Sequence, residues 1–536
     1  MAVTLTAPAQ HERDSVYARL EERILARDQV GASKVFYDLV KAGRPVDELV
    51  RETVHIHAPY THVPFHQRLD SGDVRFVNND HCLLSMRAAL QLQKLVPDET
   101  AFLPMAQTIW YIPTGLDPWN QLLGHAPGHY NRVYNMEFSG APAFPVAHWA
   151  DQPAVTSDST LQERLDHWLT LVMRCQVEEA YQTFLGLLAN PADRQQVLAQ
   201  LMFAGLIDVQ DRTVFRLSFT TGHRSYRARA TIELAETVGW ENAHDVLYAG
   251  VMDLGVGPHW YSMYEMACTY SRVVLQGQDV EMRHKNTKPL SRAEVKQTVD
   301  VIHQGNEVSV VRHIGGLLQA GKSIKSIVDA IQLAATETLI ECGSPAAYNM
   351  PMHAYEYVNT VRWFYDRFDH PHMTKLLFVA GSFVNEVYQG QQAFPGNGPR
   401  PIKAPRGAAG WSSGQILEKL DDALVGLRPD DAVGLTQAYL KAGYDTQPLV
   451  QTLALGCSKL GNDPHNQEIS LVQLEDFGRN SHAARGRLLM GAAAHAAGHR
   501  KYGEPLEAFR RFAESLGIST RQDAQGDAPV EESLLD

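Results

Sequence analysis

The amino-acid sequence predicts a mainly α-helical fold, in which tandem helix hairpins form a helical toroid or a multi-helix bundle. Over most of the 536 residues, apolar side chains recur at intervals of three and four residues, which is the period of an α-helix. Helix-start signals accompany this period, because Ser291 is followed three residues later by Glu294 in the spacing of a capping box. The third observation is a segment that recurs four times along the chain and opens each time at a histidine.

Taken in order, the stretches with the clearest helical period are residues 15–28, 159–191 and 306–343. In the second of these, Ser159 precedes a long helix that we expect to end near Asn190 and Pro191. The segment RTVFRLSFT, residues 212–220, has the composition of a strand. A single strand cannot make a sheet, so we interpret it as a linker or as half of a small ribbon.

Two segments lack helical character. Residues 394–414 contain four prolines and five glycines and predict a long surface connection. From about Thr520 the chain is polar and acidic, which predicts disorder. The predicted organisation has five parts. An N-terminal helical domain with His-rich loops (1–211) is followed by a central helix-hairpin domain (212–393) and the connection (394–414), and then by a C-terminal helical region (415–519) and a disordered acidic tail (520–536).

The recurring segment opens at His81, His223, His353 and His482, which lie 142, 130 and 129 residues apart. The first three copies run from an apolar helix through a polar break into a second apolar helix, and the fourth copy is looser. Stacked hairpins of this kind bury continuous apolar faces. We therefore expect helices arranged around a shared centre lined by these four imidazoles, which would be the catalytic residues. The alternative is an ancestral hairpin whose histidine only packs against its neighbour.

Composition excludes several classes of function. The net charge of −13 argues against nucleic acid as the main partner, because phosphate binding needs clustered Lys and Arg. The five cysteines form no Cys-x-x-Cys pair and no disulfide framework, which favours a reducing cytosol. The N-terminus has no apolar core of a signal peptide, and no stretch reaches the ~18 apolar residues of a membrane span. We expect a soluble cytoplasmic protein, and homo-oligomer formation stays open.

Histidines are densest in the first third of the chain, where two pairs have the i,i+4 spacing that suits a divalent metal on a helix. Pro64 lies inside the first pair and Pro127 inside the second, so we expect loops there. Loop histidines beside aromatic residues often contact ligands, although each one could equally be a hydrogen-bonded structural residue. The candidate metal-binding residues are His62, His66, His125, His129, His223 and His353.

Other metal motifs are weaker. His495 and His499 share i,i+4 spacing in an Ala-rich run, where we expect a solvated helix face rather than a metal site. A ferritin-like di-iron bundle needs Glu-x-x-His motifs inside long apolar helices, and the three such spacings here lie elsewhere. A phosphohydrolase of the HD type needs a His-Asp pair just ahead of the glycine, but here Met252 stands where the histidine should be. No nucleotide-binding or serine-nucleophile motif occurs.

Carboxylates complete most non-haem iron sites together with histidine. The candidates on predicted helices are Glu178, Glu179, Glu233, Glu265, Glu356 and Glu386. Aromatic residues near the repeat could wall a pocket for an aromatic substrate, and core packing is the alternative for each of them. These candidate substrate-binding residues are Trp110, Tyr111, Tyr226, Trp260, Tyr355 and Trp363.

The runs HAYEYVNTVRWFYDRF and KLLFVAGSFVNEVYQ, within residues 336–392, resemble a helical region of bacterial proteins that often also carry a Rieske iron–sulfur domain. Residues 435–467 share this resemblance. More distantly, the histidine-opened helices are similar to the questin oxidase family, which implies a Baeyer–Villiger-type oxygenase acting on aromatic polyketides. The chain has no Rieske Cys-x-His and Cys-x-x-His set, so electron transfer would need a partner.

Together these features lead to the hypothesis of a metal-dependent oxidoreductase, an oxygenase that acts on an apolar or aromatic small molecule in a His-lined helical cavity. Neutral imidazole binds iron, zinc or copper, and it titrates in the physiological range, so one residue type serves as ligand and as proton shuttle. Iron is the expected cofactor, with zinc, copper or noncovalent haem as alternatives. The rival functions are a metal-dependent hydrolase or lyase that activates water and a non-catalytic helical-repeat scaffold.

Overall fold

The computed structural model describes residues 15–26, 28–58, 62–69, 72–78, 81–105, 152–209, 221–255, 259–274, 281–459 and 465–499, with a few positions between 108 and 112 and between 510 and 517. These residues are mainly α-helical, as the sequence predicts. Their β-structure is one two-stranded sheet and two isolated bridges. None of the helices in these ranges has both the length and the apolar character that a membrane crossing requires. The predicted acidic tail, 520–536, lies outside the described residues.

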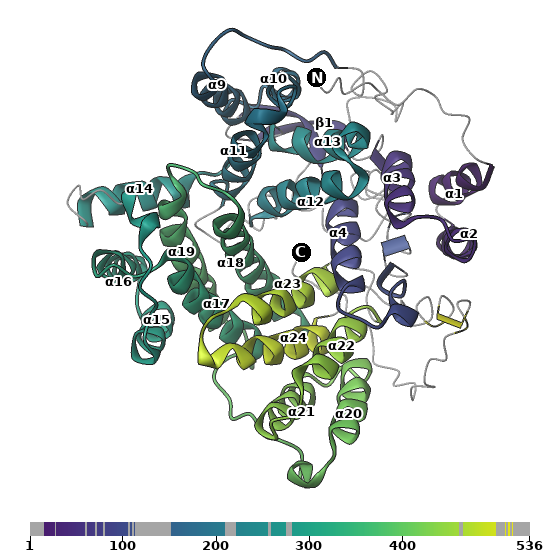
Figure 1. The fold of residues 1–536 in the computed structure, drawn as a ribbon. Coiled ribbons are helices and arrows are strands. Elements are labelled where there is room, and N and C mark those ends of the chain that lie inside the picture. The colour runs from purple at the N-terminus through teal and green to yellow at the C-terminus, as the bar shows by residue number, and fades with distance from the viewer. Residues whose placement is uncertain are drawn as a thin grey trace.

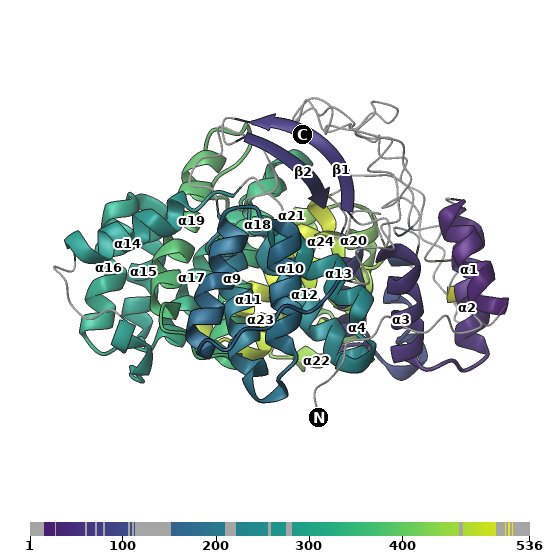
Figure 2. The ribbon, with the colours of Figure 1, turned by 90° about the horizontal axis from the view of Figure 1, so that it is seen from above.

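The chain begins with three amphipathic helices that pack on one another through residues such as Phe36: α1 (Ser15–Leu25), α2 (Gln29–Lys41) and α3 (Val46–His57). An antiparallel hairpin follows, made of β1 (His62–Leu69) and β2 (Gly72–Asn78). Its register shifts between Pro64 and Gln67, which fits a proline that has no N–H for the ladder. The ribbon lies along one face of the helical body (Figure 2).

Helix α4 (Cys82–Gln93) comes next, and the described chain resumes with α9 (Leu161–Met173), α10 (Val177–Leu188) and α11 (Arg194–Leu206). The single long helix predicted for 159–191 is therefore wrong. The physical reason is Cys175, whose φ of 55° lies in the left-handed region and ends the helical path between α9 and α10. The N-cap of α9 is Thr160, one residue after the predicted Ser159, and it forms a capping box with Glu163.

The next helices are α12 (His223–Val238), α13 (His244–Val251) and α14 (Ser262–Val274). The strand predicted at 212–220 lies outside the described residues. Val209 and Thr221, which flank that segment, form an isolated antiparallel bridge that holds its two ends together. Helix α12 starts directly after this bridge, with Gly222 as its N-cap.

The central part of the chain is a run of five helices: α15 (Arg292–Gln304), α16 (Glu307–Gln319), α17 (Ile324–Ile340), α18 (Asn349–Arg367) and α19 (Leu376–Gln391). The predicted capping box of Ser291 and Glu294 is present at the start of α15. Helices α17, α18 and α19 are buried over most of their length, which explains their continuous apolar sequence.

Residues 394–412 form an irregular connection with one short 3-10 turn, so the predicted connection, 394–414, ends two residues earlier than expected. After it come the last helices: α20 (Ser413–Val425), α21 (Pro429–Lys441), α22 (Thr446–Gly456), α23 (His465–Arg479) and α24 (Gly486–Gly498). Helices α20, α21 and α22 pack against α24, and α23 and α24 form a hairpin.

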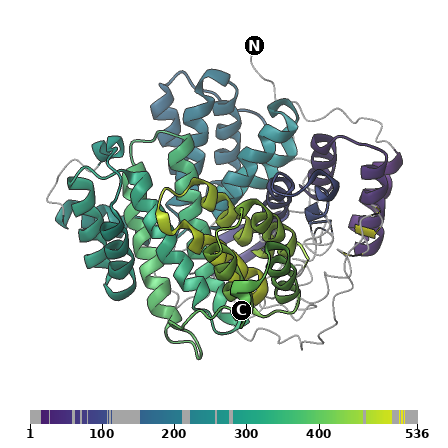
Figure 3. The ribbon, with the colours of Figure 1, turned by 60° about the horizontal axis from the view of Figure 1, so that its bottom comes forward.

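Four helices from distant parts of the sequence make the middle of the molecule. Helix α4 packs on α12 and α23, and α18 packs on the same two helices, so the four form a closed bundle. Figure 1 shows the remaining helices around it, with α9–α11, α14–α16, α20–α22 and α1–α3 on different sides. The teal α14–α16 group and the purple α1–α2 pair lie at opposite ends of the molecule (Figure 3). This bundle positions the candidate site.

Candidate metal centre

Four histidines, one from each helix of the central bundle, lie together inside it. His81 is the N-cap of α4, His223 is the first residue of α12, and His465 is the first residue of α23. His353 is in the second turn of α18. All four side chains are buried. The imidazoles meet because the N-terminal ends of the four helices lie at the same end of the bundle. We call these four residues the imidazole cluster.

The spacing of the cluster suits a metal ion. One ring nitrogen from each of His81, His223 and His465 lies within 4.8 Å of the other two. In tetrahedral coordination with metal–nitrogen distances of about 2.0–2.1 Å, the ligand nitrogens lie about 3.4 Å apart. A small movement of the three rings toward one another therefore completes a three-nitrogen site. The ring of His353 lies 4.7 Å from that of His223 and 5.0 Å from that of His465. The ring of His353 therefore lies beside this three-nitrogen site, next to His223 and His465.

Hydrogen bonds fix the orientation of two of the rings. Nδ1 of His353 donates to the main-chain oxygen of Asn349 at 2.7 Å. Nδ1 of His223 lies 3.0 Å from Oγ1 of Thr221, and the Nε2 atoms of the two histidines are 3.3 Å apart. In metalloproteins a ligand histidine almost always uses its second nitrogen in such an outer contact. Both rings are thus anchored through Nδ1 and present Nε2 to the centre.

Tyr226, one turn after His223 on α12, ties the two anchored histidines together. Its hydroxyl lies 2.7 Å from the main-chain oxygen of Thr221 and 2.7 Å from that of His353. The tyrosine is buried, and its ring contacts the ring of His223. One hydroxyl thus holds the backbone of α18 against the start of α12.

The surroundings of His223 keep its imidazole neutral. Burial lowers the pKa of His223 well below its usual value, and the neighbouring His353 and His81 lower it further. The N-terminal ends of α4, α12 and α23 carry partial positive charge, which also disfavours imidazolium. A metal needs the neutral, unprotonated nitrogen of histidine as its ligand. The environment therefore favours the protonation state that metal binding requires.

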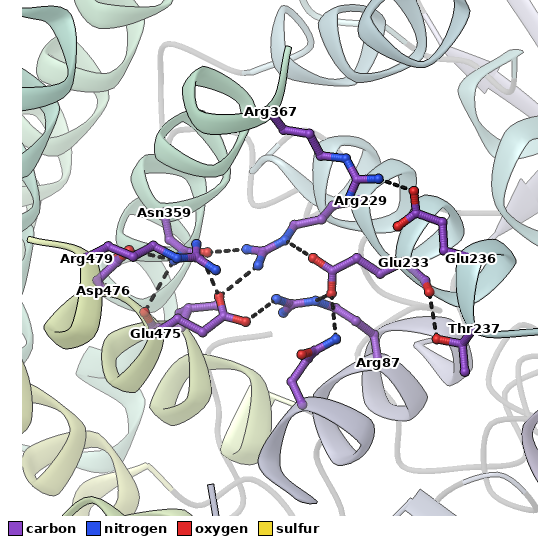
Figure 4. Close-up of polar contacts among 12 residues, drawn as sticks. Arg87, Arg229, Glu233, Glu236, Thr237, Asn359, Arg367, Glu475, Asp476 and Arg479 are labelled. Carbon is purple, nitrogen blue, oxygen red and sulfur yellow. Dashed lines mark hydrogen bonds and ion pairs between the residues drawn. The ribbon is translucent and has the colours of Figure 1, made fainter. Parts of the chain in front are cut away.

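A second polar layer lies deeper in the same bundle. Arg87 and Arg229 come six residues after His81 and His223, and Glu233 and Glu475 come ten residues after His223 and His465. At a rise of about 1.5 Å per residue, this layer begins roughly 9 Å along the helices from the cluster. Figure 4 shows that the two guanidiniums and two carboxylates alternate. We call these four residues the Arg–Glu ring.

Each member of the Arg–Glu ring contacts two others of opposite charge. Arg87 lies 3.0 Å from Glu233 and 2.6 Å from Glu475, and Arg229 lies 2.9 Å from Glu233 and 2.8 Å from Glu475. Burial acts to raise the pKa of Glu233, but the two guanidiniums outweigh it and hold the pKa at about 2. They keep the pKa of Glu475 lowered in the same way. Charges of two arginines and two glutamates cancel, so the ring is neutral as a unit.

Between the two layers lie buried acids. Glu356 follows His353 by three residues, and Glu468 follows His465 by three, so each is one turn from the cluster. Burial raises the pKa of Glu356 to about 8, against the opposing effect of Arg87 and Arg229. Its side chain is therefore neutral at pH 7. Among the described residues no group hydrogen-bonds its Oε2 atom.

The structure brings together three of the four evenly spaced histidines and excludes the fourth. His482 lies in the connection after the C-terminal end of α23, where Nε2 contacts the main-chain oxygen of Ser326 at 2.9 Å. The histidine of this helix that reaches the cluster is His465, at the other end of α23. Placing His482 in the centre is thus a wrong prediction, because fifteen residues of helix, about 22 Å, separate the two ends.

Other predicted residues fall into two groups. The loop histidines and two of the aromatic residues lie outside the part of the chain whose side chains the structure describes: His62, His66, His125, His129, Trp110 and Tyr111. By contrast, His495 and His499 are described and are buried on α24 with stacked rings 5.0 Å apart. The solvated helix face expected for them is wrong, because the Ala-rich α24 packs on α17, α21 and α23.

Three of the remaining aromatic candidates have contacts outside the imidazole cluster. The hydroxyl of Tyr355 donates to Asp476 at 2.9 Å within the core. The ring of Trp363 stacks near Arg229, 5.1 Å from its guanidinium carbon, at the level of the Arg–Glu ring. Trp260 donates its main-chain N–H to Asp208. Among these described candidates, Tyr226 is the aromatic residue for which the structure records a ring contact with the cluster.

Sequence reasoning missed His465 and the Arg–Glu ring. A signal was present in the register of the helices. His353 and His465 each precede a glutamate by three residues, and His223 and His465 each precede a glutamate by ten. His465 belongs to this pattern, whereas His482 does not. Equal spacing within helices, rather than equal spacing between them, marks the residues that meet.

Comparison with known proteins adds no assignment. The chain matches no known protein family, no curated protein and no solved structure. The chemistry of the site therefore rests on its own geometry, which is a buried set of neutral nitrogen donors able to hold a transition-metal ion.

Proposed function

We propose that this protein is a metal-dependent enzyme whose metal ion is bound by His81, His223 and His465, with His353 at the edge of the site. The observation that carries the proposal is the mutual approach of three buried imidazole nitrogens within 4.8 Å. Three imidazole nitrogens buried this close to one another form the kind of donor set that transition metals prefer.

The donor set favours a transition metal. Imidazole suits iron, copper and zinc, whereas magnesium and calcium prefer oxygen ligands. Three histidines and one open position are also the arrangement of catalytic rather than structural zinc sites. We favour a single ion over haem, because one nitrogen from each of three histidines lies within 4.8 Å of the other two, as the ligands of one ion do.

For the reaction we propose an oxidoreductase, in which iron or copper activates oxygen toward an apolar or aromatic small molecule. One point supports it: imidazole is a neutral ligand, and an all-neutral donor set favours the lower oxidation state that reacts with oxygen. Reduction of the metal would then need an electron-transfer partner. The second candidate is a hydrolase or lyase, in which a zinc-bound water is the nucleophile.

We also infer that the four central helices derive from a repeated hairpin. Histidine stands at the start of α4, α12 and α23 and in the second turn of α18. Charged residues then recur in pairs of helices: arginine six residues on in α4 and α12, and glutamate three residues on in α18 and α23. A helical-repeat scaffold without catalysis would share this architecture. It would not need four imidazoles in mutual contact.

Metal analysis of the purified protein tests the proposal. Elemental analysis after exposure to Fe(II), Cu(II) or Zn(II) and desalting should give about one ion per chain. His81→Ala and His465→Ala should lower this occupancy severalfold, because each removes one of three ligands. His482→Ala is the matched control: it is also a buried histidine of the repeat, but its ring contacts Ser326, and its occupancy should equal that of the unaltered protein.

The results separate the candidate functions. Bound iron or copper with a redox-sensitive optical spectrum supports the oxidoreductase, and bound zinc alone supports the hydrolase. A protein that takes up none of the three ions would refute the metal centre and leave the scaffold. Equal loss of metal in His465→Ala and His482→Ala would show that the imidazole cluster is not the site.

A further inference from the structure

A line of hydrogen bonds runs through the imidazole cluster in one direction. It begins at the hydroxyl of Thr221, passes through both nitrogens of His223 and both nitrogens of His353, and ends at the main-chain oxygen of Asn349. Its steps measure 3.0, 3.3 and 2.7 Å. The order of these groups determines where each proton lies.

The last acceptor sets the direction. A main-chain oxygen only accepts, so Nδ1 of His353 must carry a proton and, in the neutral ring, Nε2 carries a lone pair. The contact with His223 is then a hydrogen bond only if Nε2 of His223 carries the proton. Nδ1 of His223 consequently accepts from the hydroxyl of Thr221. In the metal-free protein, His223 is therefore the Nε2–H tautomer.

A metal ion requires the opposite tautomer of His223. Nε2 faces the centre, and a metal bound there needs its lone pair, so the proton must move to Nδ1. The atom that then receives the Nδ1–H bond is Oγ1 of Thr221, because a hydroxyl can rotate from donor to acceptor without moving its oxygen. The proton passes from one nitrogen of the ring to the other, and none is released.

We propose that Thr221 is the positioning residue of the metal centre: its hydroxyl supports either tautomer of His223 and so permits Nε2 to bind the ion. This inference rests on the proposed function, since it assigns a role toward the metal proposed above. Thr221 does not touch the ion and acts through His223. Its side chain is buried, so water does not readily replace the hydroxyl.

The backbone holds Thr221 in place for this role. Thr221 pairs with Val209 in an isolated bridge, and its main-chain oxygen accepts from the hydroxyl of Tyr226. The next residue, Gly222, has a φ of 106°, a conformation that side-chain-bearing residues rarely adopt. A Cβ atom there would lie 2.3 Å from the hydroxyl oxygen of Tyr226. The turn before α12 therefore admits glycine and directs the threonine hydroxyl at the ring.

The test compares Thr221→Val with Thr221→Ser, using Zn(II) as a diamagnetic probe. Valine keeps the shape and removes the hydroxyl, so the zinc-bound state has a buried Nδ1–H without an acceptor. Zinc affinity, measured by competition with a chromophoric chelator, should fall about tenfold to hundredfold, the range found for outer-shell partners of metal ligands. Serine keeps the hydroxyl and should restore affinity to within a few-fold of the unaltered protein.

Nitrogen NMR of histidine-labelled protein supplies a readout that loss of packing alone would not change. The His223 ring, identified with His223→Gln, should be protonated at Nε2 without zinc and at Nδ1 with zinc. The same tautomer in both states, or unchanged zinc affinity in Thr221→Val, would overturn the inference while leaving the metal site intact. If the unaltered protein binds no zinc and no other metal, the proposed function fails and this inference fails with it.

Discussion

Replacing Arg87 by methionine is the sharpest test of how the central bundle is held together. The methionine side chain replaces the unbranched stem of arginine and carries no charge. Removing the guanidinium breaks two contacts, at 3.0 Å to Glu233 and 2.6 Å to Glu475. Both carboxylates keep their contact with Arg229, and Glu475 also keeps the more distant, partly exposed Arg479 at 3.9 Å. The buried ring then carries a net charge of −1.

Breaking a buried pair by removing one partner typically costs about 3–5 kcal/mol, because the remaining charge is left uncompensated. Whole domains are stable by only about 5–15 kcal/mol, so this single change should remove a large part of the stability. Arg87→Met should therefore lower the midpoint of urea unfolding strongly, as followed by circular dichroism at pH 7. The double variant Arg87→Met/Glu233→Gln also lacks one carboxylate charge, so it should recover part of the lost stability to urea.

The matched control is Arg428→Met. Arg428 pairs with Asp431 at 3.1 Å, but both side chains are at least half exposed, and such surface pairs contribute about 0–1 kcal/mol. A loss below about 1 kcal/mol in Arg87→Met would refute the reasoning. So would a double variant less stable than the single one, since the charge imbalance would then not be the cause.

Three further changes test other features. Glu356→Gln should stabilise the metal-free protein by up to a few kcal/mol above pH 8. The pKa of Glu356 is about 8 in the folded protein and about 4.5 in the unfolded chain, so the free energy of unfolding of the unaltered protein falls as pH rises from about 4.5 to 8. Urea midpoints of both proteins at pH 5 and pH 8.5 measure this difference. Cys175→Gly should raise the thermal midpoint slightly, because a non-glycine residue at φ 55° is strained, whereas no change would show that the turn is relaxed. Gly222→Ala should lower zinc affinity and stability together through the clash with Tyr226, and an unchanged midpoint would contradict this.

The fold class followed from the sequence because periodicity is a local property. Spacing of three and four predicts each helix separately, and caps such as that of Ser291 fix where a helix begins. The break at Cys175 escaped prediction, because it depends on a backbone conformation unusual for cysteine. Periodicity thus predicts where helices occur more reliably than where they end.

The site was predictable only in part. His81, His223 and His353 each stand at or near the start of an apolar helix, so a shared position in a repeat was a sound guide to them. His482 follows the same even interval along the chain. However, it lies in the connection between the antiparallel helices α23 and α24, at the opposite end of α23 from His465. Which end of a helix meets its neighbours is decided by packing between distant segments, which spacing along the chain does not record.

The Arg–Glu ring also has a consequence for how the protein is made. Its members are Arg87, Arg229, Glu233 and Glu475, so the last one leaves the ribosome only after most of the chain has been synthesised. Until then the nascent chain holds two cations and one anion that later share a buried site. If the central bundle formed before α23 is synthesised, it would bury a net positive charge, even though α4 and α12 are already complete. Final assembly of the core therefore waits for α23.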